Sequence, residues 1–325
     1  MIVSKTDFKT IHEAVRSYIV PATNLIMSRI LQDHIIVIDG RCSFDVSDIH
    51  EFHAYGNSYL RFCNYTKLVQ FFERFGHLVK KIIISYSSLS SEVPHKAINQ
   101  NIIKRYAKHL EDLGFGMEGD EGFWEEISDG ENNFTFPEVK KFQNAGRTTP
   151  NKFALNLIFP KLESLILFEP VADVNCLENV KGLKELILAN SSIEEHKLDD
   201  IFANNKNMTM IYLVRPERRE TMRSIAKYLT KLEMLEVDFP GKNFWLRTNN
   251  SEVYTLPSVK HVDFEFDEMD EVFAVGNLSF DMPNLKKLTL TGRRINGQII
   301  NFINHFKKLE IVDFSVAEHV ALEYI

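Results

Sequence analysis

The stretch FPKLESLILFE (159–169) carries an apolar residue at Leu162, a second three positions later and a third two positions further on. The same spacing occurs in VKGLKELILAN (180–190), MPNLKKLTLTG (282–292) and FKKLEIVDFSV (306–316). Copies of this pattern begin at Val79, Leu110, Val139, Leu162, Leu183, Met208, Leu232, Val259, Leu285 and Leu309. Successive starts are 21 to 31 residues apart, so the sequence contains a loose internal repeat.

The local pattern of one repeat predicts a strand. Its last two apolar residues alternate with polar ones, as in a strand that buries one face. A further apolar residue lies three positions before most starts, at Phe136, Phe159, Val180, Leu229, Leu256, Met282 and Phe306. Four of these are followed by a proline, at Pro137, Pro160, Pro257 and Pro283. Proline at these positions is typical of a chain that leaves a helix and turns toward a strand.

Segments between the strands have the apolar spacing of amphipathic helices, most clearly at residues 68–75 and 299–306. An L-x-x-L-x-L repeat of this length is typical of leucine-rich repeat proteins. We therefore expect an α/β fold, a leucine-rich repeat solenoid with the ribonuclease-inhibitor-like horseshoe shape. Its parallel strands would line the concave face, its helices the convex face, and about ten units would fill residues 35–325. Such a chain builds a long surface rather than a pocket, which favours binding of another protein.

Composition excludes several classes of function. The net charge of −7 over 325 residues argues against a nucleic-acid partner, which normally requires a basic face. The three cysteines form no CxxC pair, and HEFH (50–53) is too short for the HExxH zinc helix, so we expect no metal site. We expect residues 50–53 to form a surface loop. No catalytic or cofactor motif and no small-molecule site are evident, which predicts a protein that is not an enzyme and has no cofactor. No apolar run is long enough to span a membrane and the first residues lack a secretory pattern, so we expect a cytoplasmic or nuclear location.

Residues 1–34 do not fit the repeat. Phe8, Ile11, Val15 and Tyr18 form one apolar helical stripe, and a second helix is expected before Leu31. HIIVIDG (34–40) then predicts a strand. A solenoid needs its first core layer covered, so one interpretation of the helical segment is a short N-terminal cap.

The order of elements resembles a known family. It runs DFKTIHEAVRSYIVPATNLIMSRIL (7–31), HIIVI (34–38), LVQFFERFGHLVKKIIIS (68–85), INQNIIKRYAKHLEDLGF (98–115) and FPEVKKFQNAG (136–146). This order resembles the insect-type F-box/leucine-rich-repeat proteins. The F-box is incomplete, because residues 1–34 resemble only its C-terminal part and no L-P-x-E-like helix precedes them.

The resemblance implies a substrate receptor of an SCF-type ubiquitin ligase, which would bind a Skp-type adaptor and, through it, a cullin complex. Under this interpretation Phe8, Ile11, Val15 and Tyr18 would contact the adaptor. The alternative is a free-standing repeat scaffold or an inhibitor-type binding protein with no link to ubiquitin. The missing first helix of the F-box favours this second interpretation.

The outward positions of the strands predict where a protein partner binds. In the repeats from Leu162 to Met208 these positions are mainly apolar, and in the next two repeats they are mainly acidic. The predicted contact residues are Ile166, Phe168, Ile187, Met210, Tyr212, Val214, Glu236, Asp238, His261, Asp263 and Glu265. A partner with apolar side chains flanked by Lys or Arg would fit them. The alternative is that loops of this chain or its segment HVALEYI (319–325) cover the apolar strip.

Overall fold

The computed structural model describes residues 34–39, 49–54, 57–62, 65–85, 99–116, 124, 135–145, 154–168, 175–189, 195–214, 220–239, 253–266, 279–292 and 302–316. The chain divides into two compact units. Unit 1 comprises residues 1–150 and 157–161, and unit 2 comprises residues 151–156 and 162–325. The predicted helices before Leu31 lie outside the described residues, so the N-terminal cap stays a prediction.

Unit 1 contains a mainly parallel sheet. Its described strands are β1 (His34–Asp39), β2 (Ile49–Ala54), β3 (Asn57–Phe62), β4 (Lys81–Ser85), β5 (Asp112–Phe115) and β6 (Lys141–Asn144). They lie in the order β2-β3-β1-β4-β5-β6, and only β2 is antiparallel to its neighbour. The strand expected at residues 34–40 is confirmed as β1. The surface loop expected at 50–53 is wrong, because these residues lie in β2, where pairing with β3 orders an otherwise polar segment.

The helix expected at residues 68–75 is confirmed as α3 (Tyr65–Phe75). Its predicted apolar stripe is at most 7% exposed. Short helical turns follow at η1 (Gly76–Leu78), η2 (Asn99–Lys104) and η3 (Ala107–His109). Further along unit 1, Phe136 and Phe142 both stack on Phe159, with ring centroids 5.3 and 4.6 Å apart. Aromatic rings thus fill the layer behind β5 and β6.

Unit 2 contains a parallel sheet whose strands follow chain order. They are β7 (Ser164–Leu167), β8 (Glu185–Ala189), β9 (Met210–Val214), β10 (Met234–Phe239), β12 (His261–Phe266), β14 (Lys287–Gly292) and β15 (Ile311–Val316). Leu165, Leu186 and Leu288 occupy the same position in three of these strands, and each is fully buried. The alternation inferred from L-x-x-L-x-L is therefore present, and the expected α/β fold with parallel strands is confirmed.

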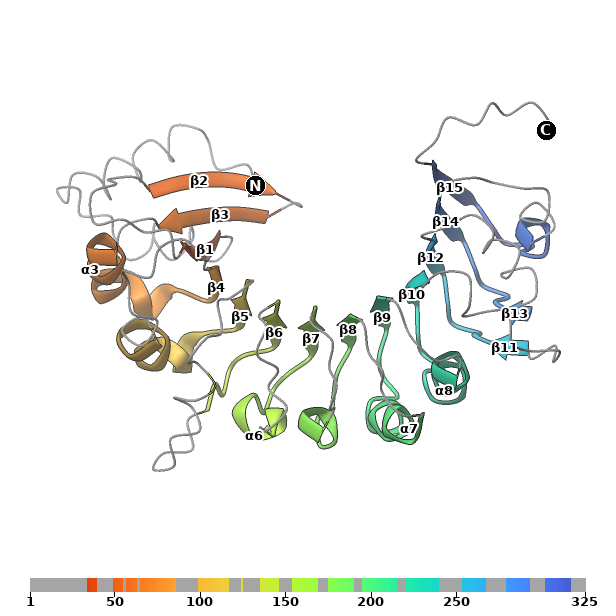
Figure 1. The fold of residues 1–325 in the computed structure, drawn as a ribbon, viewed down its shortest axis with the longest axis horizontal. Coiled ribbons are helices and arrows are strands. Elements are labelled where there is room, and N and C mark those ends of the chain that lie inside the picture. The colour runs from red at the N-terminus through yellow and green to blue at the C-terminus, as the bar shows by residue number, and fades with distance from the viewer. Residues whose placement is uncertain are drawn as a thin grey trace. The chain divides into compact units, whose positions relative to one another are not determined.

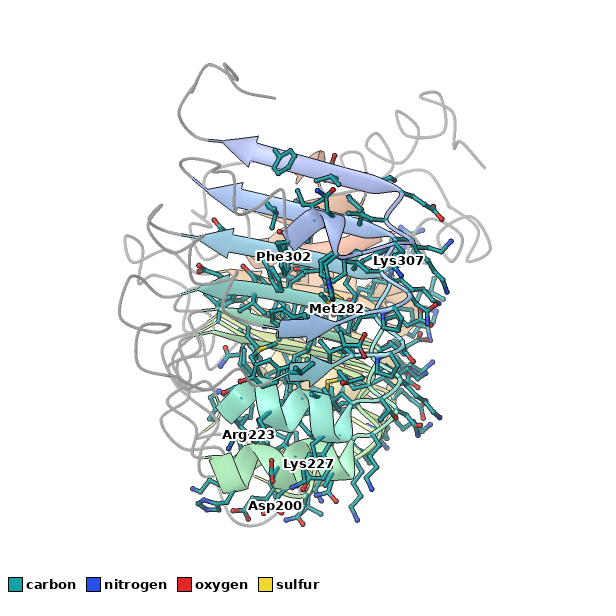
Figure 2. All side chains as sticks on the ribbon, turned by 90° about the vertical axis from the view of Figure 1, so that its right-hand side faces the viewer. Asp200, Arg223, Lys227, Met282, Phe302 and Lys307 are labelled. Carbon is teal, nitrogen blue, oxygen red and sulfur yellow. The ribbon has the colours of Figure 1, made fainter. Side chains whose placement is uncertain are left out.

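Helices cover one side of the unit 2 strands. They include α7 (Glu195–Asn204) and α8 (Glu220–Tyr228), with a short turn at η4 (Asn175–Leu177), while α6 (Leu155–Ile158) spans the sequence boundary between the two units. Residues 302–304, within the helix expected at 299–306, are also helical. Figure 1 shows α7 and α8 side by side beneath β8–β10, and Figure 2 shows Asp200, Arg223 and Lys227 on their surface. No helix among the described residues is long and apolar enough to cross a membrane.

Later in unit 2 the covering layer changes. A pair of short parallel strands, β11 (Val253–Thr255) and β13 (Ser279–Asp281), precedes β12 and β14. Tyr254 and Phe280 point from this pair into the core, where Phe280 lies 5.6 Å from the Phe264 ring. In the described part of these two repeats, a short strand rather than a helix lies directly before β12 and before β14. Two strands that each present one aromatic residue bury the same side of the sheet.

A recurring turn leads into the strands. The N–H of the first apolar residue of a repeat donates to the carbonyl three residues earlier, as in Val139 to Phe136, Val259 to Leu256 and Leu285 to Met282. Pro137, Pro257 and Pro283 occupy the second position of these turns, which suits the fixed φ of proline. The upstream apolar residue and the proline seen in the sequence are thus parts of one turn.

A second recurring contact joins each repeat to the next. The carbonyl of the residue after the first apolar position accepts two N–H groups from the following repeat. For example, the Lys184 carbonyl accepts from Thr209 and Met210 at 2.8 and 3.0 Å, and the Glu233 carbonyl accepts from Lys260 and His261 at 2.9 and 3.0 Å. The same contact occurs at Lys80, Glu111, Glu163, Thr209, Lys260 and Lys286. Although the repeats differ in length, successive repeats are joined by the same pair of backbone hydrogen bonds.

Candidate protein-binding face

The side of the unit 2 sheet opposite α7 and α8 is the candidate site, and we call it the open face. Within unit 2, no described helix lies over it (Figure 1). Parallel register aligns its side chains in rows. The central row is Ile166, Ile187, Tyr212, Glu236, Asp263, Thr289 and Asp313. On one side of it lies the row Ser164, Glu185, Met210, Met234, His261, Lys287 and Ile311, and on the other the row Val214, Asp238, Glu265 and Thr291.

The apolar part of the open face lies on β8 and β9. Ile187, Met210, Tyr212 and Val214 are partly exposed, as the sequence predicted. Phe168, immediately after β7, is 42% exposed. Ile166 differs from the prediction, because it is only 5% exposed and offers little surface for direct contact.

The acidic part lies on β10 and β12. Glu236 and Asp263 are directly opposite each other in register, and both are partly exposed. His261 and Glu265 are exposed, whereas Asp238 is only 8% exposed and is not available for contact in the way expected. The parallel register therefore joins an apolar area to a group of carboxylates within one surface.

These carboxylates disfavour one another's charge. Burial raises the pKa of Glu236, and the neighbouring Asp263 and Glu185 raise it further. Burial and the nearby Glu265 raise the pKa of Asp263 in the same way, although Lys287 opposes this. The pKa of Tyr212 is also raised, first by burial and then by Glu265, Asp238, Glu236 and Asp263. The Tyr212 hydroxyl therefore lies in a negative potential made by β10 and β12.

Charges at the edge where the strands begin are arranged differently. There the Lys and Glu side chains pair across neighbouring repeats: Lys80 with Glu111 at 2.7 Å, Lys161 with Glu138 at 2.7 Å, Lys184 with Glu163 at 2.8 Å, Lys260 with Glu233 at 2.8 Å, and Lys286 with Glu310 at 3.1 Å. In contrast, no Lys or Arg among the described residues forms an ion pair with Glu236, Asp263 or Glu265. Within the described part of the chain, the edge carboxylates are therefore paired with lysines, whereas Glu236, Asp263 and Glu265 are not.

Two side chains that the sequence reasoning did not select also belong to the open face. Glu185 accepts a hydrogen bond from the Ser164 hydroxyl and lies close enough to Glu236 to affect its pKa. Lys287 forms an ion pair with Asp313 at 3.2 Å, which limits the acidic area on the β14 side. Both occupy outward strand positions: Glu185 lies in a repeat whose apolar positions were predicted to make the contact, and Lys287 lies in the repeat that follows the predicted acidic part.

The described residues contain no group of three or more His, Cys, Asp or Glu side chains that could hold a metal ion. The predicted adaptor-contact residues Phe8, Ile11, Val15 and Tyr18 lie outside the described part of the chain, and so does the segment 319–325. Comparison with family models and with curated proteins found no match. The candidate site therefore depends on the geometry of the open face alone.

Proposed function

We propose that this chain is a leucine-rich repeat solenoid that binds a protein partner through the open face of unit 2. The repeated turn and the repeated junction between strands support the solenoid, because each repeat uses the same backbone contacts with its neighbour. The open face supports protein binding, because it joins partly exposed aliphatic and aromatic side chains to polar neighbours.

The observation that carries the proposal is a contrast between two groups of carboxylates. Those at the edge where the strands begin pair with lysines, whereas Glu236 and Asp263 of the open face lie opposite each other. Half-buried carboxylates that repel one another cost stability, and the chain shows at its edge that it pairs Lys with Glu where pairing is possible. A partner that brings Lys or Arg to Glu236, Asp263 and Glu265 would relieve this repulsion. Its apolar side chains would lie on Ile187, Met210 and Tyr212.

A peptide selection tests the proposal. A display library of random linear peptides is selected against the full chain, and enriched peptides are resynthesised and titrated by calorimetry. We expect sequences that combine aliphatic or aromatic residues with Lys or Arg. Tyr212→Ala and Glu265→Lys should each weaken these peptides about tenfold or more, because they remove an aromatic anchor or reverse a facing charge.

Asp200→Lys is the matched control, because it makes the same type of charge reversal at an exposed position of α7, on the other side of the sheet (Figure 2). It should leave binding unchanged. Equal loss of binding in Glu265→Lys and Asp200→Lys would show a general charge effect. No loss with Tyr212→Ala and Phe168→Ala would count against the open face as the contact surface.

We propose two roles in which the chain would use this face, and one experiment separates them. The family resemblance supports a substrate-recognition component of an SCF-type ubiquitin ligase, located in the cytoplasm or nucleus, in which the open face holds the substrate. A free-standing scaffold or inhibitor-type binder with no link to ubiquitin would use the same open face. Co-expression with a Skp-type adaptor distinguishes them: co-purification that Phe8→Ala and Ile11→Ala abolish supports the receptor, and no co-purification supports the scaffold.

A further inference from the structure

The last described strand of unit 2 leaves part of its core exposed. Leu288 and Leu290 of β14 are 0% and 6% exposed. At the matching positions of β15, Val312 is partly exposed and Phe314 is 45% exposed. Leu309, which begins the last repeat, is also partly exposed, whereas its counterpart Leu285 is fully buried. The apolar layer is therefore complete at β14 and incomplete at β15.

The outer edge of β15 has no partner strand within the described part of unit 2. β15 pairs with β14, and no other described strand pairs with it. An unpaired edge leaves backbone N–H and C=O groups that can accept another strand, and proteins commonly cover such edges. Unit 1 contains an example of such cover, since its parallel sheet ends in the antiparallel strand β2, which pairs with β3 along six residues.

The segment directly after β15 has a strand pattern. Residues 317–325 read AEHVALEYI and lie outside the described residues. In a strand, Val320, Leu322 and Tyr324 would share a face without charge, whereas Ala321, Glu323 and Ile325 would share the face that carries a carboxylate. The segment therefore has a sequence suited to one side of a sheet.

The length of the connection decides which side that is. If residues 317–319 form a three-residue hairpin loop, Val320 lies opposite Val316, Leu322 opposite Phe314 and Tyr324 opposite Val312. All three would then extend the incomplete apolar layer. Three-residue loops are common in hairpins and place their last residue in the left-handed region, where histidine, here His319, is enriched among non-glycine residues.

A two-residue loop gives a worse match. It would shift the pairing by one residue and bring Ala321 and Glu323 opposite Phe314 and Val312, while the apolar residues moved to the other face. Sequence alternation and loop length therefore agree on one register.

We propose that residues 320–325 pair with the outer edge of β15 as an antiparallel strand and complete the apolar layer of unit 2. The occupant is this chain's own segment, because a three-residue connection holds it next to the edge at a high effective concentration. A second copy of the chain would have to compete with that local segment.

Disulfide trapping in the full chain tests the register. Ser315 and Ala321 would lie opposite each other on the open-face side. With oxidised glutathione as the oxidant, Ser315→Cys/Ala321→Cys should therefore form an intrachain disulfide faster in native buffer than in urea. Ser315→Cys/Val320→Cys, which matches the two-residue loop, should form much less. Ser315→Cys alone shows any reaction with the natural cysteines, and peptide mapping identifies each bond.

Two results would overturn the proposal. Equal disulfide yield from both double variants would mean that the segment has no defined register. Dimers linked through Cys at position 315 as the main product would assign the edge to a second copy. A variant lacking residues 320–325 provides an independent measurement, with a lower Tm and increased self-association expected; an unchanged Tm would also contradict the proposal.

Glu323→Lys adds a test that keeps the segment. In the proposed register Glu323 lies opposite Asp313, so a lysine there should raise the Tm by replacing a like-charge pair with an opposite-charge pair. Glu318→Lys lies in the proposed loop and should leave the Tm unchanged. Equal effects of the two substitutions would argue against the proposed pairing.

Discussion

The side chain of Asn205 forms buried hydrogen bonds to backbone groups of the previous repeat and of α7. Asn205 occupies the position three residues before Met208, where other repeats have an apolar side chain. Its side chain is almost fully buried and reaches back to the turn of the previous repeat. There Oδ1 accepts from the Leu183 N–H at 2.9 Å, and Nδ2 donates to the Val180 carbonyl at 2.9 Å and to the Ile201 carbonyl at 2.8 Å.

This amide replaces the direct hydrogen bond that closes the equivalent turn in other repeats. Between Val180 and Leu183 the chain contains Gly182, whose φ of 88° is in the left-handed region. Glycine adopts this conformation without the steric cost that a side chain would add. Gly182 and Asn205 therefore act together: the glycine permits a turn of different shape, and the asparagine satisfies the backbone groups that this shape leaves open.

The first prediction concerns Asn205→Ala. The substitution should lower the free energy of unfolding by about 3 kcal/mol, because it leaves a buried N–H and two buried carbonyls without their partner. Urea denaturation followed by circular dichroism measures the loss. Asn204→Ala is the matched control, because Asn204 is exposed and donates one hydrogen bond, to the Glu178 carbonyl at 3.2 Å. Its effect should stay within about 0.5 kcal/mol, and equal losses would contradict the assigned function of Asn205.

At the scale of elements, the contact between α7 and α8 depends on one carboxylate. Asp199 of α7 accepts hydrogen bonds from three side chains of α8: the Ser224 hydroxyl, Lys227 Nζ at 3.0 Å and the Tyr228 hydroxyl at 3.2 Å. Burial raises the pKa of Asp199, but these hydrogen bonds together outweigh it and lower the pKa below the usual 3.8. The charged form of Asp199 is therefore stabilised in the folded chain.

The second prediction concerns Asp199→Ala. It should lower the free energy of unfolding at neutral pH by about 1 to 3 kcal/mol, since it leaves the buried Ser224 hydroxyl without an acceptor. Because the folded pKa of Asp199 is depressed, its stabilisation is present above the unfolded pKa and lost as pH falls through the folded value. The difference from the wild type should therefore shrink in strongly acidic buffer. Asp200→Ala, at the exposed neighbouring position, should have little effect at any pH, and a similar effect of both would contradict the prediction.

Several elements could be predicted from the sequence, and the reason is periodicity. Strands with an L-x-x-L-x-L core and the helix α3 each have an apolar spacing that only one type of element satisfies. β2 could not be predicted, because the polar segment IHEFHA is ordered by its partner strand and not by its own pattern. The pair β11 and β13 was missed for the same reason, since each strand has three residues and depends on the other.

The open face was predicted more completely than the turns. Outward strand positions follow directly from the alternation, and equivalent residues of neighbouring repeats become neighbours in space, as Glu236 and Asp263 do. The degree of burial of Ile166 and Asp238 was not predictable, because it depends on the surroundings of each strand and not on its pattern. Nor was the role of Asn205 predictable, because the Leu183 N–H and the Val180 carbonyl that it binds belong to another repeat.

For the molecule as a whole, the distribution of charge links stability to function. Opposite charges pair along the strand-start edge within each unit, whereas the open face of unit 2 keeps Glu236 and Asp263 opposite each other. A surface that had evolved for stability alone would gain by neutralising one of them. Binding surfaces commonly keep such unfavourable arrangements, because the partner provides the compensation.

The last prediction tests this cost directly. Glu236→Gln should raise the free energy of unfolding at neutral pH by about 0.2 to 1 kcal/mol, because it removes one of two like charges that face each other. The folded pKa of Glu236 is raised, so its unfavourable contribution appears as pH rises through the interval above the unfolded pKa, and it is absent below that interval. The stabilisation should therefore disappear in acidic buffer.

Glu233→Gln provides the comparison, because it is the same substitution three residues earlier, at an edge carboxylate that is paired with Lys260 at 2.8 Å. It should leave stability unchanged or slightly lower at neutral pH, since an exposed ion pair contributes at most about 1 kcal/mol. Urea titrations of both variants at neutral and acidic pH measure the two effects with one method. If Glu236→Gln lowered the free energy of unfolding, repulsion between the Glu236 and Asp263 carboxylates would not destabilise the folded chain. The proposal of a basic partner would then lose its main support.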